Sequence, residues 1–173
     1  MDSYNLNLIS AMTNHLNQHK LESSLKETMS IMGGYSPQQR NSIARYYDTE
    51  VLEKFTDILG RPLRRDEMRY IAGNSSKVAN AIMMGKNYFK IPRPFVLIPN
   101  IGHIPVIGPE SPSYPSGHAA GYSALHKMFS KIDPQNEPRY RELRNNGAAS
   151  RVLAGVHTPT DIIGGFIISD LII

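Results

Sequence analysis

Helical periodicity, with no stretch of strict alternation, is the feature of this sequence that most constrains its fold. The longest periodic segment runs from Arg64 to about Tyr88, and its apolar stripe consists of Met68, Ile71, Val78 and Ile82. Apolar residues spaced in this way share one face of an α-helix, whereas a half-buried strand needs them at every second position. The sequence therefore predicts a long amphipathic helix here and a largely helical chain.

Shorter helices are predicted before this segment. One repeats apolar residues at three and four positions and stops at Gly33-Gly34, its apolar positions being Leu21, Leu25, Met29 and Met32. The next begins at Ser36-Pro37-Gln38-Gln39, a capping box with proline at the first helical position. A third ends at Gly60 before Pro62 and contains Leu52, Phe55 and Leu59. We expect short helices over residues 1–60 and a helical core over residues 64–173.

Length and composition indicate one domain with a mild preference for anions. The chain has 173 residues, 40% of them hydrophobic, which is enough for a single core. Its 19 basic and 15 acidic residues give a net charge of +4, which favours anionic ligands but is too small to argue for nucleic acid. Cysteine is absent, so disulfides, thiolate catalysis and cysteine-based zinc sites are excluded.

The two ends of the sequence bear on its location. The first 20 residues contain an acid at Asp2, no basic region and no continuous apolar region, which is unlike a signal peptide. The longest apolar run, residues 162–173, contains Asp170 and is too short to span a bilayer. We therefore expect a soluble, cytoplasmic protein without an integral membrane segment, either in the producing cell or in the cytosol of a host.

Two cations follow the long helical stripe. Lys86 lies four residues after Ile82, so it extends the buried face, where an ammonium group is costly unless an anion pairs with it. The alternative is a lysine at the helix end that reaches water and favours the helix dipole. Arg93 lies between two prolines, which hold its backbone extended, and its planar guanidinium suits two phosphate oxygens. It could equally be a surface residue.

Residues 92–115 are rich in proline, which predicts an ordered irregular loop. The next helix should begin at Ser116, whose hydroxyl can cap it, and Gly117 would let a ligand approach the backbone. Free amide groups at such a helix start bind anions. His118 lies in the first turn, where a lone histidine can also be a packed or capping residue. It shares a stripe with Tyr122, Leu125 and Phe129.

The third cluster follows a helix predicted from about Pro134 towards Val156. Thr158-Pro159-Thr160-Asp161 can be read as a capping box that opens the last helix. That reading explains Asp161, but it explains neither His157 nor Arg151. In the functional reading, the carboxylate holds one ring nitrogen of His157 and leaves the other free as a nucleophile.

Together these residues resemble the three-part signature of the phosphatidic acid phosphatase type 2 superfamily, which includes class A acid phosphatases and vanadium-dependent haloperoxidases. Six residues separate Lys86 from Arg93-Pro94, the block at 115–118 reads PSGH, and Ser150-Arg151 is followed at family spacing by His157 and Asp161. The conjunction of three blocks in order carries the resemblance, which covers the C-terminal half. It implies an all-α, compact single-domain bundle over residues 1–173, and size and solubility bring it closest to soluble bacterial class A acid phosphatases.

The resemblance also implies an activity and a role for each residue. The chain would be a metal-independent phosphatase without cofactors, acting on phosphorylated small molecules. His157 would attack phosphorus to form a phosphohistidine, Asp161 would orient its ring, and His118 would act as general acid and base. The groups binding the phosphate oxygens would be Lys86, Arg93, Ser116, Gly117 and Arg151.

Some alternatives remain beside this interpretation. Ala119 stands where class A enzymes commonly have threonine, and their secretion signal is missing, so substrate preference and periplasmic location are not carried over. A peripheral phosphatase for lipid phosphate or pyrophosphate could approach a membrane through the apolar C-terminal helix or through a partner. A non-catalytic phosphate- or nucleic-acid-binding protein could use the basic residues within 61–69 and 139–144. The family and an exposed apolar tail favour a homodimer. His103 and His126 are interpreted as structural.

Overall fold

The structure, a computed structural model, describes residues 3–107 and 110–173. Within these residues every regular element is helical and there is no strand. The helices are α1 (Ser3–Gln18), α2 (Leu21–Gly33), α3 (Pro37–Tyr46), α4 (Val51–Leu59), α5 (Arg65–Phe89), α6 (Pro94–Leu97), α7 (Gly117–Ile132), the 3₁₀ turn η1 (Pro134–Asn136), α8 (Glu137–Leu153) and α9 (Pro159–Ile172). The predicted all-α fold is confirmed.

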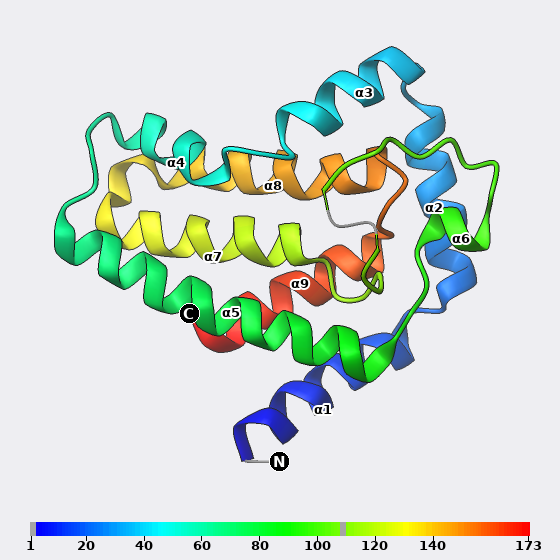
Figure 1. Cartoon of the computed structure of the whole chain (residues 1–173), viewed down its shortest axis with the longest axis horizontal. Helices are drawn as coiled ribbons and strands as arrows, with labels where there is room; N and C mark the ends of the chain where they lie inside the picture. Colours follow the sequence, from blue (N-terminus) through cyan, green and yellow to red (C-terminus); the bar gives the residue numbers. More distant parts are fainter. Residues whose placement is uncertain (1–2, 108–109) are drawn as a thin grey trace.

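Helix α7 lies at the centre of the bundle. It packs against α5, α8 and α9, and α7 and α8 run side by side in opposite directions (Figure 1). Helices α1 and α2 cover α9, α3 covers α8, and α4 contacts both α7 and α8. An aromatic cluster joins these layers, because the rings of Phe55, Phe129 and Tyr140 lie 5.4 to 5.8 Å apart, within the range of favourable ring pairs.

Local sequence signals set several helix ends where they were predicted. Ser36 accepts a hydrogen bond from the amide of Gln39, whose side chain accepts from the Ser36 amide, and Pro37 is the first helical residue. Thr158 and Asp161 form the same reciprocal pair at the start of α9. Helix α4 ends at Gly60, which has a positive φ of 72°, a conformation that glycine adopts without steric cost.

The buried faces of α5 and α2 differ in part from the predicted stripes. Met68 is 55% exposed, because the first turn of α5 instead buries Glu67, which the guanidinium groups of Arg61 and Arg64 pair at 2.8 Å. Helix α2 buries Ser24 and Thr28 together with Met32, whereas Leu21 and Met29 are exposed. Periodicity located both helices correctly but did not identify the face of α2 that is packed.

The proline-rich segment is also more structured than predicted. Arg93 directly precedes the four-residue helix α6, in which Pro94 supplies the first helical position, so the expected irregular loop contains one helical turn. Residues 108–109 of this segment lie outside the described residues. The predicted helix from Pro134 begins instead as the 3₁₀ turn η1, and α8 itself ends at Leu153 rather than near Val156.

Helix α9 corrects the prediction of an exposed apolar tail. Its residues Ile162, Gly164, Gly165 and Ile168 are buried against the bundle, and only Ile163 and Leu171 are large hydrophobic residues with high exposure. The argument for a homodimer from an exposed tail therefore falls, and so does that for membrane approach through this helix. No helix in residues 3–107 and 110–173 has the length and apolar character that crossing a bilayer requires.

The arrangement brings the three sequence clusters to one end of the bundle. The end of α5, the start of α7 and the end of α8 lie together on the right of Figure 1, next to the loop that carries α6. The predicted site residues belong to these helix ends and to the segments that follow them. Loops joined to a rigid helical scaffold are where functional side chains commonly lie.

Candidate active site

A small cavity at this end of the bundle contains most of the predicted residues. Its volume is about 170 Å³, and its walls are Lys86, Arg93, Ile107, Ser111, Gly117, His118, Arg151, Val156 and His157. Two imidazoles and three cations from segments far apart in the sequence therefore share one concave surface. Of the predicted residues, Ser116 and Asp161 do not line the cavity and lie behind its wall.

The imidazole of His157 is buried and has a defined orientation. Its Nε2 lies 2.9 Å from Nη1 of Arg93, while its Nδ1 lies 3.5 Å from Oδ2 of Asp161. A guanidinium can only donate hydrogen bonds, so Nε2 must be the acceptor and carry the lone pair. The proton of the neutral ring is then on Nδ1, facing the carboxylate of Asp161. Nε2 faces the guanidinium of Arg93, which lines the cavity.

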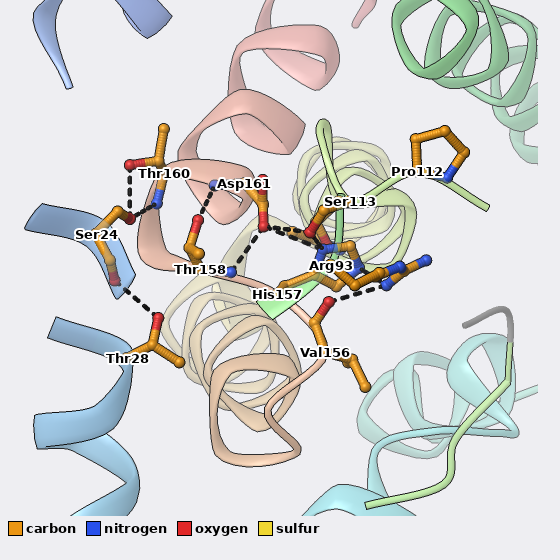
Figure 2. A network of polar contacts seen from close by, with 12 residues as sticks. Ser24, Thr28, Arg93, Pro112, Ser113, Val156, His157, Thr158, Thr160 and Asp161 are labelled. Carbon is orange, nitrogen blue, oxygen red and sulfur yellow. Dashed lines mark hydrogen bonds and ion pairs between the residues drawn. The ribbon is translucent and has the colours of Figure 1, made fainter. Parts of the chain in front are cut away.

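Asp161 holds this orientation through contacts of its own (Figure 2). Its Oδ2 accepts hydrogen bonds from the hydroxyl of Ser113 at 2.6 Å and from the amide of Thr158 at 2.7 Å. The hydroxyl of Ser113 also lies 3.4 Å from Nδ1 of His157. The carboxylate thus caps α9 and faces the imidazole at the same time, so the two readings of the Thr158 to Asp161 segment are compatible.

Burial, neighbouring charges and hydrogen bonds favour a neutral His157 beside an ionised Asp161. Burial lowers the pKa of His157, and the positive charges of Arg93 and Lys86 lower it further, against the opposite effect of Asp161. Burial by itself would raise the pKa of Asp161, but the hydrogen bonds from His157, Ser113 and Thr158 outweigh it and leave that pKa below its usual value. A neutral imidazole beside an ionised carboxylate is the form a histidine nucleophile needs.

The start of α9, which presents Asp161, is itself fixed by the N-terminal helices. The amide and the hydroxyl of Thr160 both donate to the hydroxyl oxygen of Ser24 in α2, at 3.2 and 2.8 Å (Figure 2). The carbonyl of Thr160 lies 3.1 Å from Nε2 of His15 in α1. Buried polar groups with satisfied partners restrict the positions a segment can adopt, so α1 and α2 support the site from behind.

Lys86 is buried, which rules out the alternative of a lysine reaching into water. Its ammonium group donates to the backbone carbonyls of Pro112 and Ser113, in the segment just before the PSGH block. Burial lowers its pKa to about 8, and the nearby charge of Arg93 contributes to the decrease. The lysine is therefore a cation with a low pKa that lines the cavity.

Arg93 is also buried and is fixed by several acceptors. Its Nε donates to the carbonyl of Ser111 at 2.9 Å, its Nη2 to the hydroxyl of Ser111 at 3.2 Å, and its Nη1 to the carbonyl of Val156 at 3.0 Å. The backbone of Arg93 is extended, as the flanking prolines predicted. The interpretation as an unattached surface arginine is therefore wrong.

His118 and Arg151 meet at a residue that the sequence reasoning missed. Nη1 of Arg151 pairs with Oδ1 of Asp48 at 2.7 Å, and Nε2 of His118 lies 3.1 Å from the carbonyl and 3.4 Å from Oδ1 of Asp48. Burial lowers the pKa of His118, as does the charge of Arg151, whereas the carbonyl and carboxylate of Asp48 raise it. Asp48 lies between α3 and α4, where no motif marked it.

The predicted anion-binding turn at the start of α7 is present in part. The hydroxyl of Ser116 accepts from the amide of Ala119 at 3.3 Å, so it caps the helix as predicted, and Ser116 is completely buried. Gly117 follows at the cavity wall. Phosphate binding by the Ser116 hydroxyl remains a prediction, and the geometry favours a capping role for this group.

Other residues of the site were also not identified from the sequence. Ser113 holds Asp161, Ser111 holds Arg93, and Ile107 forms an apolar wall. A serine or an isoleucine in a proline-rich loop has no distinctive spacing, so only the folded chain reveals it. The two histidines interpreted as structural lie outside the cavity wall: His103 stacks on Phe95 and His126 pairs with Glu137.

A sequence model of the PAP2 superfamily matches residues 70–173, which is more than half of the chain and includes all three clusters. The chain belongs to the PAP2 superfamily. This match confirms the resemblance to the phosphatidic acid phosphatase type 2 superfamily that the three motifs indicated. Membership supports phosphatase activity in general, that is, hydrolysis of phosphoric esters.

The fold is that of a solved PAP2 protein as well. A crystal structure described as the first transmembrane PAP2 type phosphatidylglycerolphosphate phosphatase, from Bacillus subtilis, aligns with a TM-score of 0.61 and 15% sequence identity. The alignment covers 99% of this chain and 92% of that chain, so the similarity of fold extends over nearly the whole chain. No curated protein matches the sequence.

Proposed function

We propose that this protein is a metal-independent phosphatase of the acid phosphatase type, which hydrolyses phosphomonoesters through a phosphohistidine intermediate on His157. The observation that carries the proposal is the convergence of His157 and His118 on one cavity whose walls also include Lys86, Arg93 and Arg151. The three cations take the electrostatic part that a metal ion would otherwise play in phosphoryl transfer.

In the first step, Nε2 of His157 attacks the phosphorus atom and the ester P–O bond breaks. The lone pair of Nε2 lies on the side of Arg93, whose N–H shifts from the imidazole to a phosphate oxygen when substrate binds. His118 gives a proton to the leaving alcohol oxygen. The proton on Nδ1 of His157 stays in contact with Asp161, which stabilises the positive charge that develops on the ring.

In the second step, water attacks the phosphohistidine. His118, now neutral, takes a proton from that water, the P–N bond breaks, and inorganic phosphate leaves with His157 neutral again. The equatorial oxygens remain in contact with Lys86, Arg93 and Arg151 in both steps. Groups fixed in advance in a buried site stabilise transition-state charge without reorganising at the moment of reaction.

Hydrolysis of a chromogenic phosphate ester tests the proposal. Wild-type turnover should persist with a metal chelator and be blocked by vanadate, and His157→Ala should lower it by at least about a thousandfold. His126→Ala is the matched control, because it removes a partly buried histidine of α7 that pairs with Glu137 outside the cavity. Equal losses in the two variants, or loss of activity with chelator, would contradict the mechanism.

A second candidate, hydrolysis of a lipid phosphate at a membrane surface, is favoured by one observation. Val96 and Leu97 of α6 and Ile107 of the cavity wall are 59%, 39% and 63% exposed. Helix α6 follows Arg93 directly, so exposed aliphatic side chains lie next to the cation that lines the cavity. Such side chains can enter the interfacial layer of a bilayer. The solved relative is described as a phosphatidylglycerolphosphate phosphatase.

Comparison of a vesicle-bound phospholipid monoester with a soluble ester separates the two candidates. If the lipid is the substrate, Val96→Ser with Leu97→Ser should lower turnover of vesicles severalfold and leave that of the soluble ester unchanged. Met68→Ser, at an exposed position of α5, is the control for lost surface hydrophobicity. Faster turnover of the soluble ester, with no effect of the paired substitution on vesicles, selects the soluble phosphomonoesterase.

A further inference from the structure

Asp48 contacts two polar side chains of the cavity wall, His118 and Arg151, although no sequence motif includes it. It lies in the turn between α3 and α4, and its side chain is only 12% exposed. This turn precedes the part of the chain that the superfamily model matches. The carboxylate is therefore a contribution of the N-terminal helices to a site whose other polar groups come from α5 and later elements.

Each oxygen of Asp48 has a partner at the site. Oδ1 accepts from Nη1 of Arg151 at 2.7 Å, and Oδ2 accepts from the amide of Ile107 at 3.0 Å. The backbone carbonyl accepts from Nε2 of His118 at 3.1 Å, and Oδ1 lies 3.4 Å from the same nitrogen. One residue thus contacts an imidazole, a guanidinium and the cavity's apolar wall.

The charge of Asp48 matters because the remaining groups around His118 are basic. Arg151 faces the imidazole from α8 and Arg93 from the start of α6, while Lys86 of α5 and His157 of the α8–α9 connection line the same cavity. The charges of Arg151 and Arg93 disfavour a positive charge on His118. A carboxylate oxygen 3.4 Å from Nε2 favours the protonated ring through its charge, and the backbone carbonyl that accepts from Nε2 keeps the proton on that nitrogen.

We propose that Asp48 is a positioning residue of the active site: its carboxylate stabilises the protonated form of His118 and fixes the guanidinium of Arg151 at the cavity wall. The inference rests on the proposed function, since that function makes His118 the general acid. It adds that the turn between α3 and α4 extends to higher pH the range in which this acid carries its proton. Asp48 acts through His118 and Arg151 and does not itself take part in bond making.

Replacement of the carboxylate by an amide separates charge from shape. In Asp48→Asn the carbonyl contact to His118 remains, but the negative charge near Nε2 is lost. The pKa of His118 should then fall. Because the general acid must be protonated in the free enzyme, the alkaline limb of the kcat/KM profile should move to lower pH, by about one pH unit. Asp48→Glu, which keeps the charge, should leave the alkaline limb close to its wild-type position.

The matched control is Asp133→Asn. Asp133 is another buried carboxylate, accepting from Tyr140 and Asn136, and it lies fifteen residues beyond His118, at the far end of α7. That separation is about 22 Å along the helix axis. Asp133→Asn should leave the position of the alkaline limb unchanged. A limb that moves equally in both variants, or a uniform loss in Asp48→Asn with no movement of the limb, would show a structural role only and overturn the proposal.

A titration of His118 followed by NMR of its ring protons tests the inference without turnover. The midpoint should be lower in Asp48→Asn than in wild type, with His118→Gln used to assign the signal. If wild type does not hydrolyse esters but the midpoint shifts, the proposed function fails and the contact between Asp48 and His118 stands. If wild type is active and the midpoint is the same in both proteins, the proposal about Asp48 is wrong.

Discussion

At the scale of single residues, the reactive imidazole is fixed from two sides. Arg93 donates to Nε2 of His157, and Asp161 faces Nδ1 while it accepts from Ser113 and Thr158. This arrangement determines which nitrogen carries the lone pair before any substrate binds. It also means that a phosphate oxygen must take over the hydrogen bond from Arg93 before Nε2 can attack phosphorus.

Asp161→Asn tests whether this carboxylate does more than cap α9. The amide oxygen can still accept from the amide of Thr158, so the helix should stay folded, but the charge that stabilises a cationic His157 is lost. We expect turnover of a chromogenic ester to fall by roughly a hundredfold or more, as for other carboxylates behind a catalytic histidine. Circular dichroism should show a thermal transition within a few degrees of wild type. Unchanged turnover would leave only the capping role.

The low pKa of Lys86 predicts a pH dependence of anion binding. Its pKa in the free enzyme is about 8, so the cation is present below that pH and is lost as the pH rises through it. The inhibition constant of phosphate should therefore increase on the alkaline side. In Lys86→Met, inhibition by phosphate should be weaker at neutral pH. The inhibition constant of this variant should increase on the alkaline side only as far as the titration of phosphate itself requires. Identical profiles for the two proteins would show that Lys86 does not bind the anion.

At the scale of helices, the start of α7 is positioned by the close approach of α9. A Cβ at Gly165 would lie 2.5 Å from the backbone carbonyl of Ser116 and 2.9 Å from the amide of Ala120. These are backbone atoms, so they cannot rotate away as the end of a flexible side chain can. Glycine at this position lets α9 lie directly against the turn that contains Gly117 and His118.

Gly165→Ala should therefore destabilise the protein and disturb the cavity. We expect a loss of about 1 to 3 kcal/mol in the free energy of unfolding, the range for overpacking, together with lower turnover. Urea unfolding measures the first and ester hydrolysis the second. Gly73→Ala in α5 is the control, because no side chain and no backbone beyond its own helical turns lies within 4 Å of the added Cβ, and the substitution should stabilise the helix by up to about 1 kcal/mol. A destabilised Gly73→Ala would contradict the packing argument.

Several helix ends and the three clusters at the cavity could be predicted from the sequence. The capping boxes at Ser36 and Thr158 and the end at Gly60 were predicted, because each depends on residues within four positions. The three clusters that line the cavity were predicted from their spacing. Asp48 and Ser113 were not, since their partners lie 103 and 48 residues away and only the tertiary fold brings them together.

At the scale of the molecule, the N-terminal helices belong to the same core as the site. Leu8 and Met12 of α1 and Phe55 of α4 are buried in one cluster with Tyr122 and Phe129 of α7. The short helices of residues 1–60 and the helices of residues 64–173 therefore share one hydrophobic core. We predict that the chain unfolds as one unit.

Equilibrium unfolding tests this prediction. Far-UV circular dichroism and tyrosine fluorescence should report coincident transitions in denaturant, as expected for a single cooperative domain. Phe55→Ala removes a fully buried ring next to Phe129 and Tyr140 and should lower the free energy of unfolding by about 3 to 5 kcal/mol. The two probes should remain coincident in this variant. A separate early transition would show that the N-terminal helices fold independently.

The most direct test of the account is to trap the phosphorylated enzyme. In His118→Ala, an ester with a good leaving group should still phosphorylate His157, but water is no longer activated, so the intermediate should accumulate. Mass spectrometry after an alkaline denaturing quench should then find one phosphoryl group on the peptide that contains His157, and none in the double variant that also carries His157→Ala. A phosphoryl group on another residue, or none in a protein whose wild type hydrolyses the ester, would contradict nucleophilic attack by His157.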